Sequence, residues 1–173
     1  MSFGYDRLKQ TGDKGARKKT NNKWFETQDS ISYREDFYKQ KIMYPNMTKF
    51  LPFYLDNKGF MQNDKSFLIT GQDLEYLTSF LNSSLFKYCF IDNFPELQGG
   101  TREIRKVFLD KIPVLKVTNQ TNKEFKKLVL QIQELTTKGL PTKELELKID
   151  HKIFNLYNLT DEERQKIGFI EIL

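Results

Sequence analysis

Basic residues near flexible segments are the groups in this sequence with the clearest chemistry, which is the binding of a polyanion. Residues 1–23 hold seven basic and two acidic side chains, so this segment accounts for the whole net charge of +5. Lysine and arginine neutralise phosphates as point charges, which makes nucleic acid the first partner to expect. A solvated chain end explains the charge equally well when this feature is taken alone. The candidate phosphate contacts in this basic arm are Lys14, Arg17, Lys18, Lys19 and Lys23.

Trp24 directly follows the basic arm and is also a candidate for contact with DNA. An aromatic ring beside cations can stack on a base or wedge between base steps. Packing of Trp24 and Phe25 on a hydrophobic core, where they would anchor the arm, is the favoured interpretation of the two.

A second segment, residues 44–49, joins two expected strands and contains side chains that can bond to base edges. Asn46 can pair with adenine through two hydrogen bonds, and Lys49 can donate to guanine. An ordinary polar turn explains this segment when it is considered by itself.

A third segment begins with Gly99 and Gly100, which allow a backbone to approach a phosphate closely. Three cations follow, Arg102, Arg105 and Lys106, and they would complete such a contact. A flexible loop with solvated charges is the alternative. The hypothesis of nucleic-acid binding therefore depends on the combination of the three segments.

The sequence lacks the residue sets that catalysis or metal binding would need. His151 is the only histidine and Cys89 the only cysteine, which excludes a disulfide within the chain and a thiolate metal cluster. There is no glycine-rich nucleotide-binding loop, and no Asp/Asn-Pro-Pro-aromatic motif of the kind with which amino-methylating enzymes hold a flipped base. We expect no catalytic centre, no metal and no cofactor in this chain.

Cysteine usage and hydropathy indicate the compartment. One cysteine suits a reducing cytoplasm. No apolar run approaches the ~20 residues of a membrane helix. We expect a cytoplasmic protein with no membrane contact.

The hydrophobic pattern predicts an α+β fold. Short apolar runs at 41–44, 50–55 and 66–69 are typical of strands, and a turn sequence at 56–59 before Phe60 and Met61 predicts a hairpin. Leucines then recur every three or four residues, which predicts one amphipathic helix over about 72–90 with Thr70 as its N-cap.

The last third of the chain has the pattern of two helices. Apolar stripes at 125–135 and 145–156, separated by a Gly-Leu-Pro break, predict an antiparallel helix pair. Thr121 with Glu124, and Thr160 with Glu163, are typical of capping boxes. We expect three parts: a basic arm at 1–23, an α+β body at 24–116 and a helical tail at 117–173. The tail should act as a docking or spacer element, because its stripes need a partner surface.

An ordered series of loose motifs resembles the TaqI-like C-terminal specificity domain of type IIG restriction-modification enzymes and related adenine-specific DNA methyltransferases. The series covers nearly the whole chain. Where relatives often carry arginine, this chain has Gln28, which we treat as a candidate base reader together with Asn46 and Lys49. The motifs are Asp13-Lys14-Gly15, Lys41-Ile42-Met43-Tyr44-Pro45, Phe67-Leu68-Ile69-Thr70-Gly71, Leu81-Asn82-Ser83, Phe108-Leu109-Asp110-Lys111-Ile112-Pro113, Ile149-Asp150, Tyr157 and Leu159-Thr160.

The resemblance implies a mixed-sheet DNA target-recognition domain followed by a C-terminal helical hairpin. It also implies duplex DNA as a partner and a bacterial parent enzyme, whose methyltransferase domain lies in the same polypeptide or in a partner subunit. That domain would methylate the exocyclic amine of adenine with S-adenosylmethionine, and a nuclease domain using Mg²⁺ could accompany it. The alternative function is a non-catalytic protein-interaction or subunit-docking module whose basic surface meets an acidic partner.

Overall fold

The computed structural model of the protein describes residues 11–14, 16, 19–23 and 34–169. The chain divides into two units, residues 1–36 and residues 37–173, which are considered separately below. A short 3-10 helix, η1 (Arg34–Tyr38), lies where the two units meet in sequence. No helix in the described part of the chain is long and apolar enough to cross a membrane.

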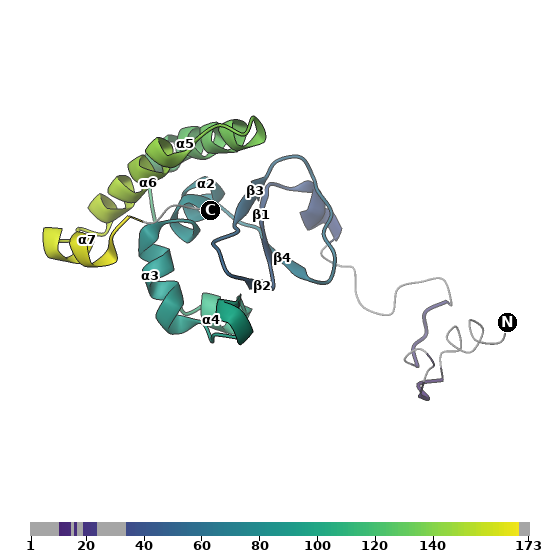
Figure 1. Ribbon diagram of the computed structural model, residues 1–173. Helices are drawn as coiled ribbons and strands as arrows, with labels where there is room; N and C mark the ends of the chain where they lie inside the picture. The colour runs from purple at the N-terminus through teal and green to yellow at the C-terminus, as the bar shows by residue number, and fades with distance from the viewer. Residues whose placement is uncertain (1–10, 15, 17–18, 24–33, 170–173) are drawn as a thin grey trace. The chain divides into compact units, whose positions relative to one another are not determined.

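The second unit contains an antiparallel three-stranded sheet in the order β3-β1-β4 (Figure 1). Its strands are β1 (Lys41–Pro45), β3 (Tyr54–Asp56) and β4 (Ser66–Ile69). Ile42 of the central strand pairs with Leu55 on one side and Ile69 on the other. Because side chains alternate across a strand, this row of apolar residues gives the sheet one core-facing side. All pairs among the described strands are antiparallel, whereas a mixed sheet was expected.

The prediction of a hairpin at 56–61 is wrong, because Phe60 and Met61 form no strand. The carboxylate of Asp56 accepts hydrogen bonds from the backbone N–H groups of Lys58 and Phe60, both at 2.8 Å. The backbone donors that would form a strand ladder are therefore used in a local turn. The chain continues through a loop to β4, which pairs with β1 instead.

Two helices stand where one was predicted. They are α2 (Leu74–Leu81) and α3 (Ser84–Asn93). Asn82 and Ser83, which lie between them, are not helical. The Ser83 side chain caps α3 by accepting from the Phe86 N–H. The expected cap at Thr70 is also wrong: the N-cap of α2 is Asp73, which has φ of 53° and makes no side-chain cap bond.

The stretch between α3 and the tail contains short elements. These are the 3-10 turn η2 (Gln98–Gly100), strand β5 (Arg102–Glu103) and helix α4 (Lys106–Leu109). Strand β5 pairs with β2 (Met47–Thr48) in a second, two-stranded sheet.

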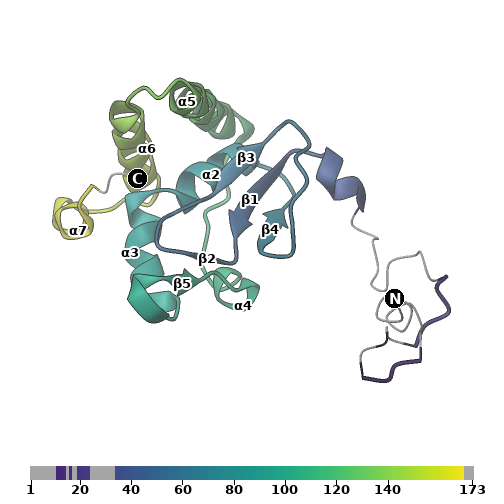
Figure 2. The same ribbon diagram turned by 45° about the vertical axis from the view of Figure 1, so that its right-hand side comes forward.

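The tail forms the predicted helices, α5 (Asn119–Thr137), α6 (Lys143–Leu156) and α7 (Asp161–Ile167). Helices α5 and α6 pack on one another as a hairpin closed by residues 138–142 (Figure 2). The capping box of Thr160 and Glu163 is confirmed. The one at Thr121 is wrong, because Thr118 caps α5 and its side chain accepts from the Thr121 N–H.

The tail packs on the body rather than presenting its apolar stripes to an outside partner. Phe125 of α5 and Ile153 and Phe154 of α6 are buried in the same core cluster as Ile42 and Leu55 of the sheet. Helix α5 lies along α2, while α6 and α7 contact α3. The expectation of a free docking surface along these stripes is corrected, because the body itself covers them. The α+β class with C-terminal helices is confirmed.

Candidate nucleic-acid interface

The structure brings two of the three predicted binding segments together. Strands β2 and β5 pair antiparallel, with Met47 opposite Glu103 and Thr48 opposite Arg102 (Figure 2). The Ile104 N–H donates to the Asn46 carbonyl at 2.8 Å and extends this ribbon by one bond. We call residues 46–49 and 97–106 the ribbon surface.

The diglycine forms a left-handed turn at one end of the ribbon. Gly99 and Gly100 have φ of 73° and 77°, a conformation that favours glycine. The Leu97 N–H donates to the Thr101 carbonyl at 2.6 Å and closes the turn. A Cβ added to Gly99 would stand 3.9 Å from the Lys49 ammonium, and one added to Gly100 would meet nothing within 4 Å. The turn therefore leaves its backbone open to a ligand beside a cation.

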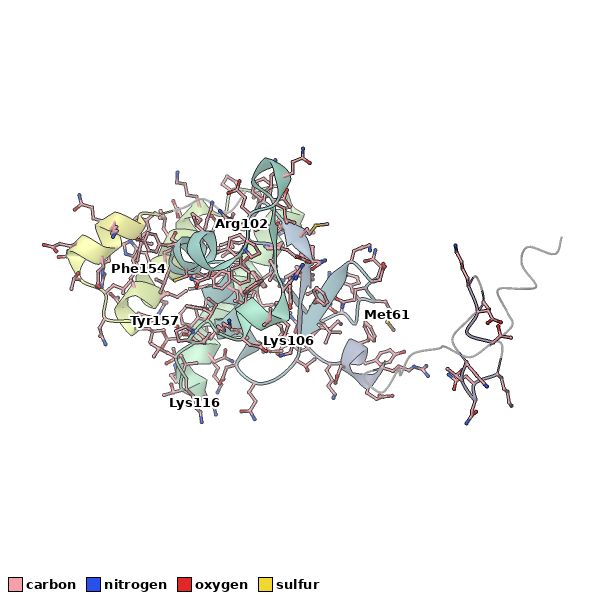
Figure 3. All side chains as sticks on the ribbon, turned by 90° about the horizontal axis from the view of Figure 1, so that it is seen from below. Met61, Arg102, Lys106, Lys116, Phe154 and Tyr157 are labelled. Atoms are coloured by element: carbon pink, nitrogen blue, oxygen red, sulfur yellow. The ribbon has the colours of Figure 1, made fainter. Side chains whose placement is uncertain are left out.

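Arg105 and Lys106 lie at the other end of β5, where the chain enters α4. Figure 3 shows Lys106 on this helix. Their side chains are 59% and 82% exposed, and each pairs with a nearby acid, Glu103 and Asp110 respectively. The Lys106–Asp110 pair is exposed on both sides, and such pairs contribute about 0–1 kcal/mol, so a phosphate can displace Asp110 at little cost. Both cations are thus accessible to an anionic ligand.

Arg102 has a different environment. Its side chain is only 15% exposed, and its guanidinium donates to the Phe94 carbonyl at 2.6 Å and to Glu96 at 3.2 Å. It also lies 6.0 Å from the centre of the Phe90 ring. These contacts tie β5 to the end of α3. Its contact with phosphate stays a prediction, but the described bonds give it a positioning role in the ribbon surface.

Asn46 and Lys49, the candidate base readers, lie on the ribbon surface. The backbone of Asn46 joins the two sheets, because its N–H donates to the Lys65 carbonyl at 2.8 Å and its carbonyl accepts from Ile104. Its side chain is partly exposed, and that of Lys49 is exposed. Lys111, an exposed cation just after α4, was not singled out from the sequence, although it continues the same basic run.

The basic arm belongs to the first unit and is described only in part. Lys14, Lys19 and Lys23 are exposed, and the Ala16 N–H donates to the Asp13 carbonyl in a turn. Their contact with DNA stays a prediction. The remaining candidates in this unit lie outside the described residues, namely Arg17, Lys18, Trp24 and Gln28.

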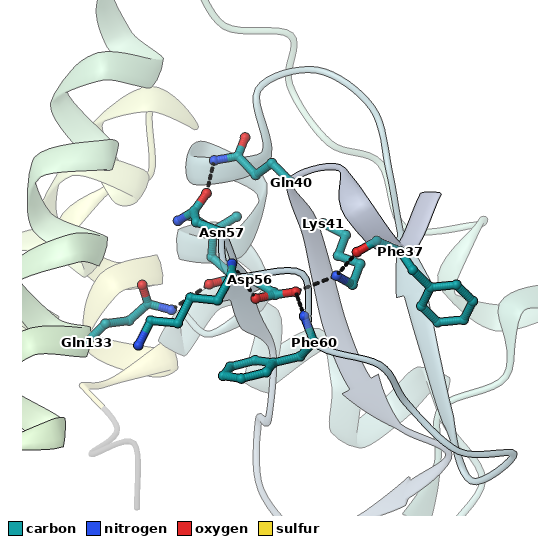
Figure 4. Close-up of polar contacts among 9 residues, drawn as sticks. Phe37, Gln40, Lys41, Asp56, Asn57, Phe60 and Gln133 are labelled. Carbon is teal, nitrogen blue, oxygen red and sulfur yellow. Dashed lines mark hydrogen bonds and ion pairs between the residues drawn. The ribbon is translucent and has the colours of Figure 1, made fainter. Parts of the chain in front are cut away.

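A buried ion pair, which the sequence did not predict, fixes the sheet from which the ribbon emerges (Figure 4). The Lys41 ammonium of β1 donates to the Asp56 carboxylate of β3 and to the Phe37 carbonyl. Both side chains of the pair are fully buried. Burial alone would raise the pKa of Asp56, but the bonds from Lys41 and from two backbone N–H groups outweigh burial and hold this pKa below its usual value. The nearby Gln133 of α5 donates to the Leu55 carbonyl at 2.8 Å, which ties the tail to the same strand.

No group of three or more His, Cys, Asp or Glu side chains that could hold a metal ion occurs in the part of the chain that the structure describes. His151 is exposed on α6, with its ring 4.8 Å from that of Phe169. Cys89 is a partly buried cysteine on α3.

The comparisons with known proteins bear on this surface. The family model of the TaqI-like C-terminal specificity domain matches residues 5–114. No curated protein matches the chain. The family match covers more than half of the chain and includes the whole ribbon surface, whereas helices α5–α7 lie beyond it. The chain therefore belongs to the family of TaqI-like C-terminal specificity domains, the DNA-recognising parts of restriction-modification enzymes.

Proposed function

We propose that this chain reads a short duplex DNA sequence for an enzyme that methylates the exocyclic amine of adenine. The antiparallel pairing of β2 with β5 carries the proposal, because it joins residues 54 and 56 positions apart in the chain and so places Lys49 and the basic residues 105–106 on one surface. The major groove of B-DNA admits a two-stranded β-ribbon. Lys49 lies beside the diglycine turn at one end of this ribbon, and Arg105 and Lys106 lie at the other.

Each group on the surface has a role in this proposal. Arg105 and Lys106 contact phosphates and set the register of the ribbon on the duplex, as phosphate contacts generally do. Asn46 and Lys49 face the base edges and supply sequence preference. Arg102 holds the ribbon against α3 through Phe94 and Glu96. The basic arm adds further phosphate contacts through Lys14, Arg17, Lys18, Lys19 and Lys23.

Catalysis belongs to other domains in this proposal. A methyltransferase domain of the same polypeptide or of a partner subunit would use S-adenosylmethionine, and an associated nuclease would use Mg²⁺. The recognition domain holds the duplex while the catalytic domain takes the target adenine out of the stack. Membership of a specificity-domain family supports this division of labour.

Selection from a library of random duplexes tests the proposal directly. The full chain should enrich one short consensus over successive rounds. Asn46→Ala should relax the consensus at one or two positions, because a bidentate contact contributes about 1–3 kcal/mol of discrimination against the wrong base. Asn155→Ala, a change on α6 away from the ribbon surface, is the control and should return the wild-type consensus. Recovery of duplexes with no common sequence would contradict the proposal.

A further inference from the structure

A cavity of about 390 Å³ lies next to the ribbon surface, between the three-stranded sheet and helices α2 and α4. Its volume is within the range of small-ligand pockets. The walls are mainly aliphatic, formed by side chains of β4, α2, α4 and the segment after α4. They include Leu68, Ile69, Leu77, Leu81, Leu109 and Ile112.

Tyr44 of β1 lines this cavity and is a candidate hydrogen-bond donor to its contents. The residue is 5% exposed, and its ring is held between those of Phe53 and Phe67, with centroids 5.3 and 5.6 Å away. Among the described residues, none hydrogen-bonds its hydroxyl. Burial raises the pKa of this hydroxyl, and the nearby Asp110 carboxylate raises it further, so the group stays a neutral donor. This donor is available to a ligand in the cavity that can accept a hydrogen bond.

The rim of the cavity carries a cation, Lys106, in an exposed ion pair with Asp110. Lys106 and Asp110 both line it, and the Lys106 side chain is one of the exposed cations of the ribbon surface. A site with apolar walls, an inner hydrogen-bond donor and an outer cation matches a nucleotide, which has a flat ring with a polar edge and a phosphate. Extruded bases are bound in this manner, with apolar contacts to the ring faces and hydrogen bonds to the edge.

We propose that this cavity takes up one nucleotide unit of the bound DNA, with the base inside against Tyr44 and the phosphate outside at Lys106. The inference rests on the proposed function, because the DNA must first lie on the ribbon surface. It adds to that function a site for a base that has left the helical stack, within the recognition domain itself.

The test compares a matched duplex with the same duplex carrying one central mismatch, using fluorescence anisotropy and the full chain. A mismatched base leaves the stack at lower cost, so the mismatched duplex should bind about threefold to tenfold more tightly. Tyr44→Phe should bring the ratio of the two affinities close to one, and Leu109→Trp, which fills the cavity, should do the same. Tyr54→Phe is the matched control, because this tyrosine lies on β3 outside the cavity, and it should keep the wild-type ratio. Tyr44→Phe should fold normally, since its hydroxyl has no protein partner, and thermal unfolding checks this.

A second arm titrates the chain with deoxyadenosine and thymidine monophosphates and follows tyrosine resonances by NMR. Equal affinity for matched and mismatched duplexes would contradict the proposal that the cavity binds a nucleotide of the bound DNA. A mismatch preference that survives Tyr44→Phe would contradict it as well. Mononucleotide binding that is lost in Tyr44→Phe without any mismatch preference assigns the cavity to free nucleotides instead. If no duplex binds at all, the proposed function fails, and the mononucleotide arm alone decides whether the cavity holds a nucleotide.

Discussion

At the scale of single residues, the Lys41–Asp56 pair shows how the fold holds charge in its interior. Lys41→Met should destabilise the protein by about 3–5 kcal/mol at pH 7, because it leaves a buried carboxylate without its cation. Urea denaturation measures the effect. Lys127→Met, at an exposed position on α5, should change stability by less than about 0.5 kcal/mol. Similar losses in the two variants would show that Lys41 has no special role.

The same pair predicts a response to acid. The pKa of Asp56 is lowered in the folded state, so its contribution to stability is present above the unfolded pKa, near ~4, and is lost as the pH falls through the folded value. The deficit of Lys41→Met relative to the wild type should therefore shrink when the pH falls below about 4. Urea midpoints of both proteins between pH 7 and pH 3 measure this, and a constant deficit would contradict the assignment.

Asp150 of α6 should behave in the opposite way. Burial raises its pKa, although the Ser84 N–H and hydroxyl donate to its carboxylate and oppose this shift. A raised pKa means that stability is greatest below the unfolded pKa and is lost as the pH rises through the folded value. Asp150→Asn retains an oxygen for the Ser84 N–H, so it should match or exceed the wild type at pH 8 and lose that advantage near pH 4. Asp150→Leu removes the acceptor of the Ser84 N–H, so it should lower the stability of the folded protein by about 1–3 kcal/mol. Urea midpoints at the two pH values test both variants.

Residue types indicated the binding chemistry, but not which cations remain accessible. Arg102, Arg105 and Lys106 are equivalent in the sequence, yet only Arg102 is enclosed by contacts with Phe94 and Glu96. The guanidinium of Arg102 donates to the backbone carbonyl of Phe94, eight residues earlier in the chain. A pattern of side-chain types does not predict a bond to a backbone carbonyl. Tyr44 had no visible role for the same reason, because its cavity is formed by residues distant in the chain.

At the scale of elements, the helix predicted as one and observed as two shows a limit of periodicity. The apolar residues keep helical spacing across the break, namely Leu74, Leu77, Leu81 and Leu85. Their pattern therefore gives no sign that the helix is interrupted. The break depends on Asn82, whose side chain accepts from the Phe53 N–H and donates to the Phe53 carbonyl. This contact spans 29 residues and depends on the tertiary fold. The tail helices were predictable because their stripes are long and their breaks are local.

The N-cap of α5 is Thr118 in the structure, whereas the sequence motif predicted Thr121. Thr118→Ala should cost about 1 kcal/mol, because its side chain accepts from the Thr121 N–H at the start of the helix. Thr121→Ala should cost less than half as much, since its hydroxyl contacts only Thr118 among the described residues. Urea denaturation of the two variants ranks them, and the reverse order would favour the cap predicted from the sequence.

The ribbon was the least predictable element of the candidate site. Each of its two segments was visible as a polar, basic loop. Their pairing joins Met47 to Glu103 through two-residue strands, which are too short to show alternation.

At the scale of the whole molecule, the tail completes the core. A chain ending at residue 117 loses Phe125, Ile153 and Phe154 from the core cluster and uncovers the sheet and α2. Each large core side chain contributes about 2–5 kcal/mol, and the total stability of a domain is about 5–15 kcal/mol, so this fragment should not fold. Circular dichroism during urea titration should show no cooperative transition. A chain ending at residue 160, which lacks only α7 and the residues after it, is the control and should retain a transition. Cooperative unfolding of the shorter fragment would show that the tail is a separate element.

The central claim is that the ribbon surface binds DNA phosphates, and the salt dependence of duplex binding tests it most directly. The logarithm of the binding constant falls with the logarithm of salt concentration, with a slope of about −0.9 per phosphate contact. Replacing Arg105 and Lys106 together by alanine should make the slope shallower by about 2. The double variant at Lys123 and Lys127, two exposed lysines of α5, removes the same charge and should leave the slope unchanged. Equal flattening in both variants would mean that net charge, and not the ribbon surface, holds the DNA.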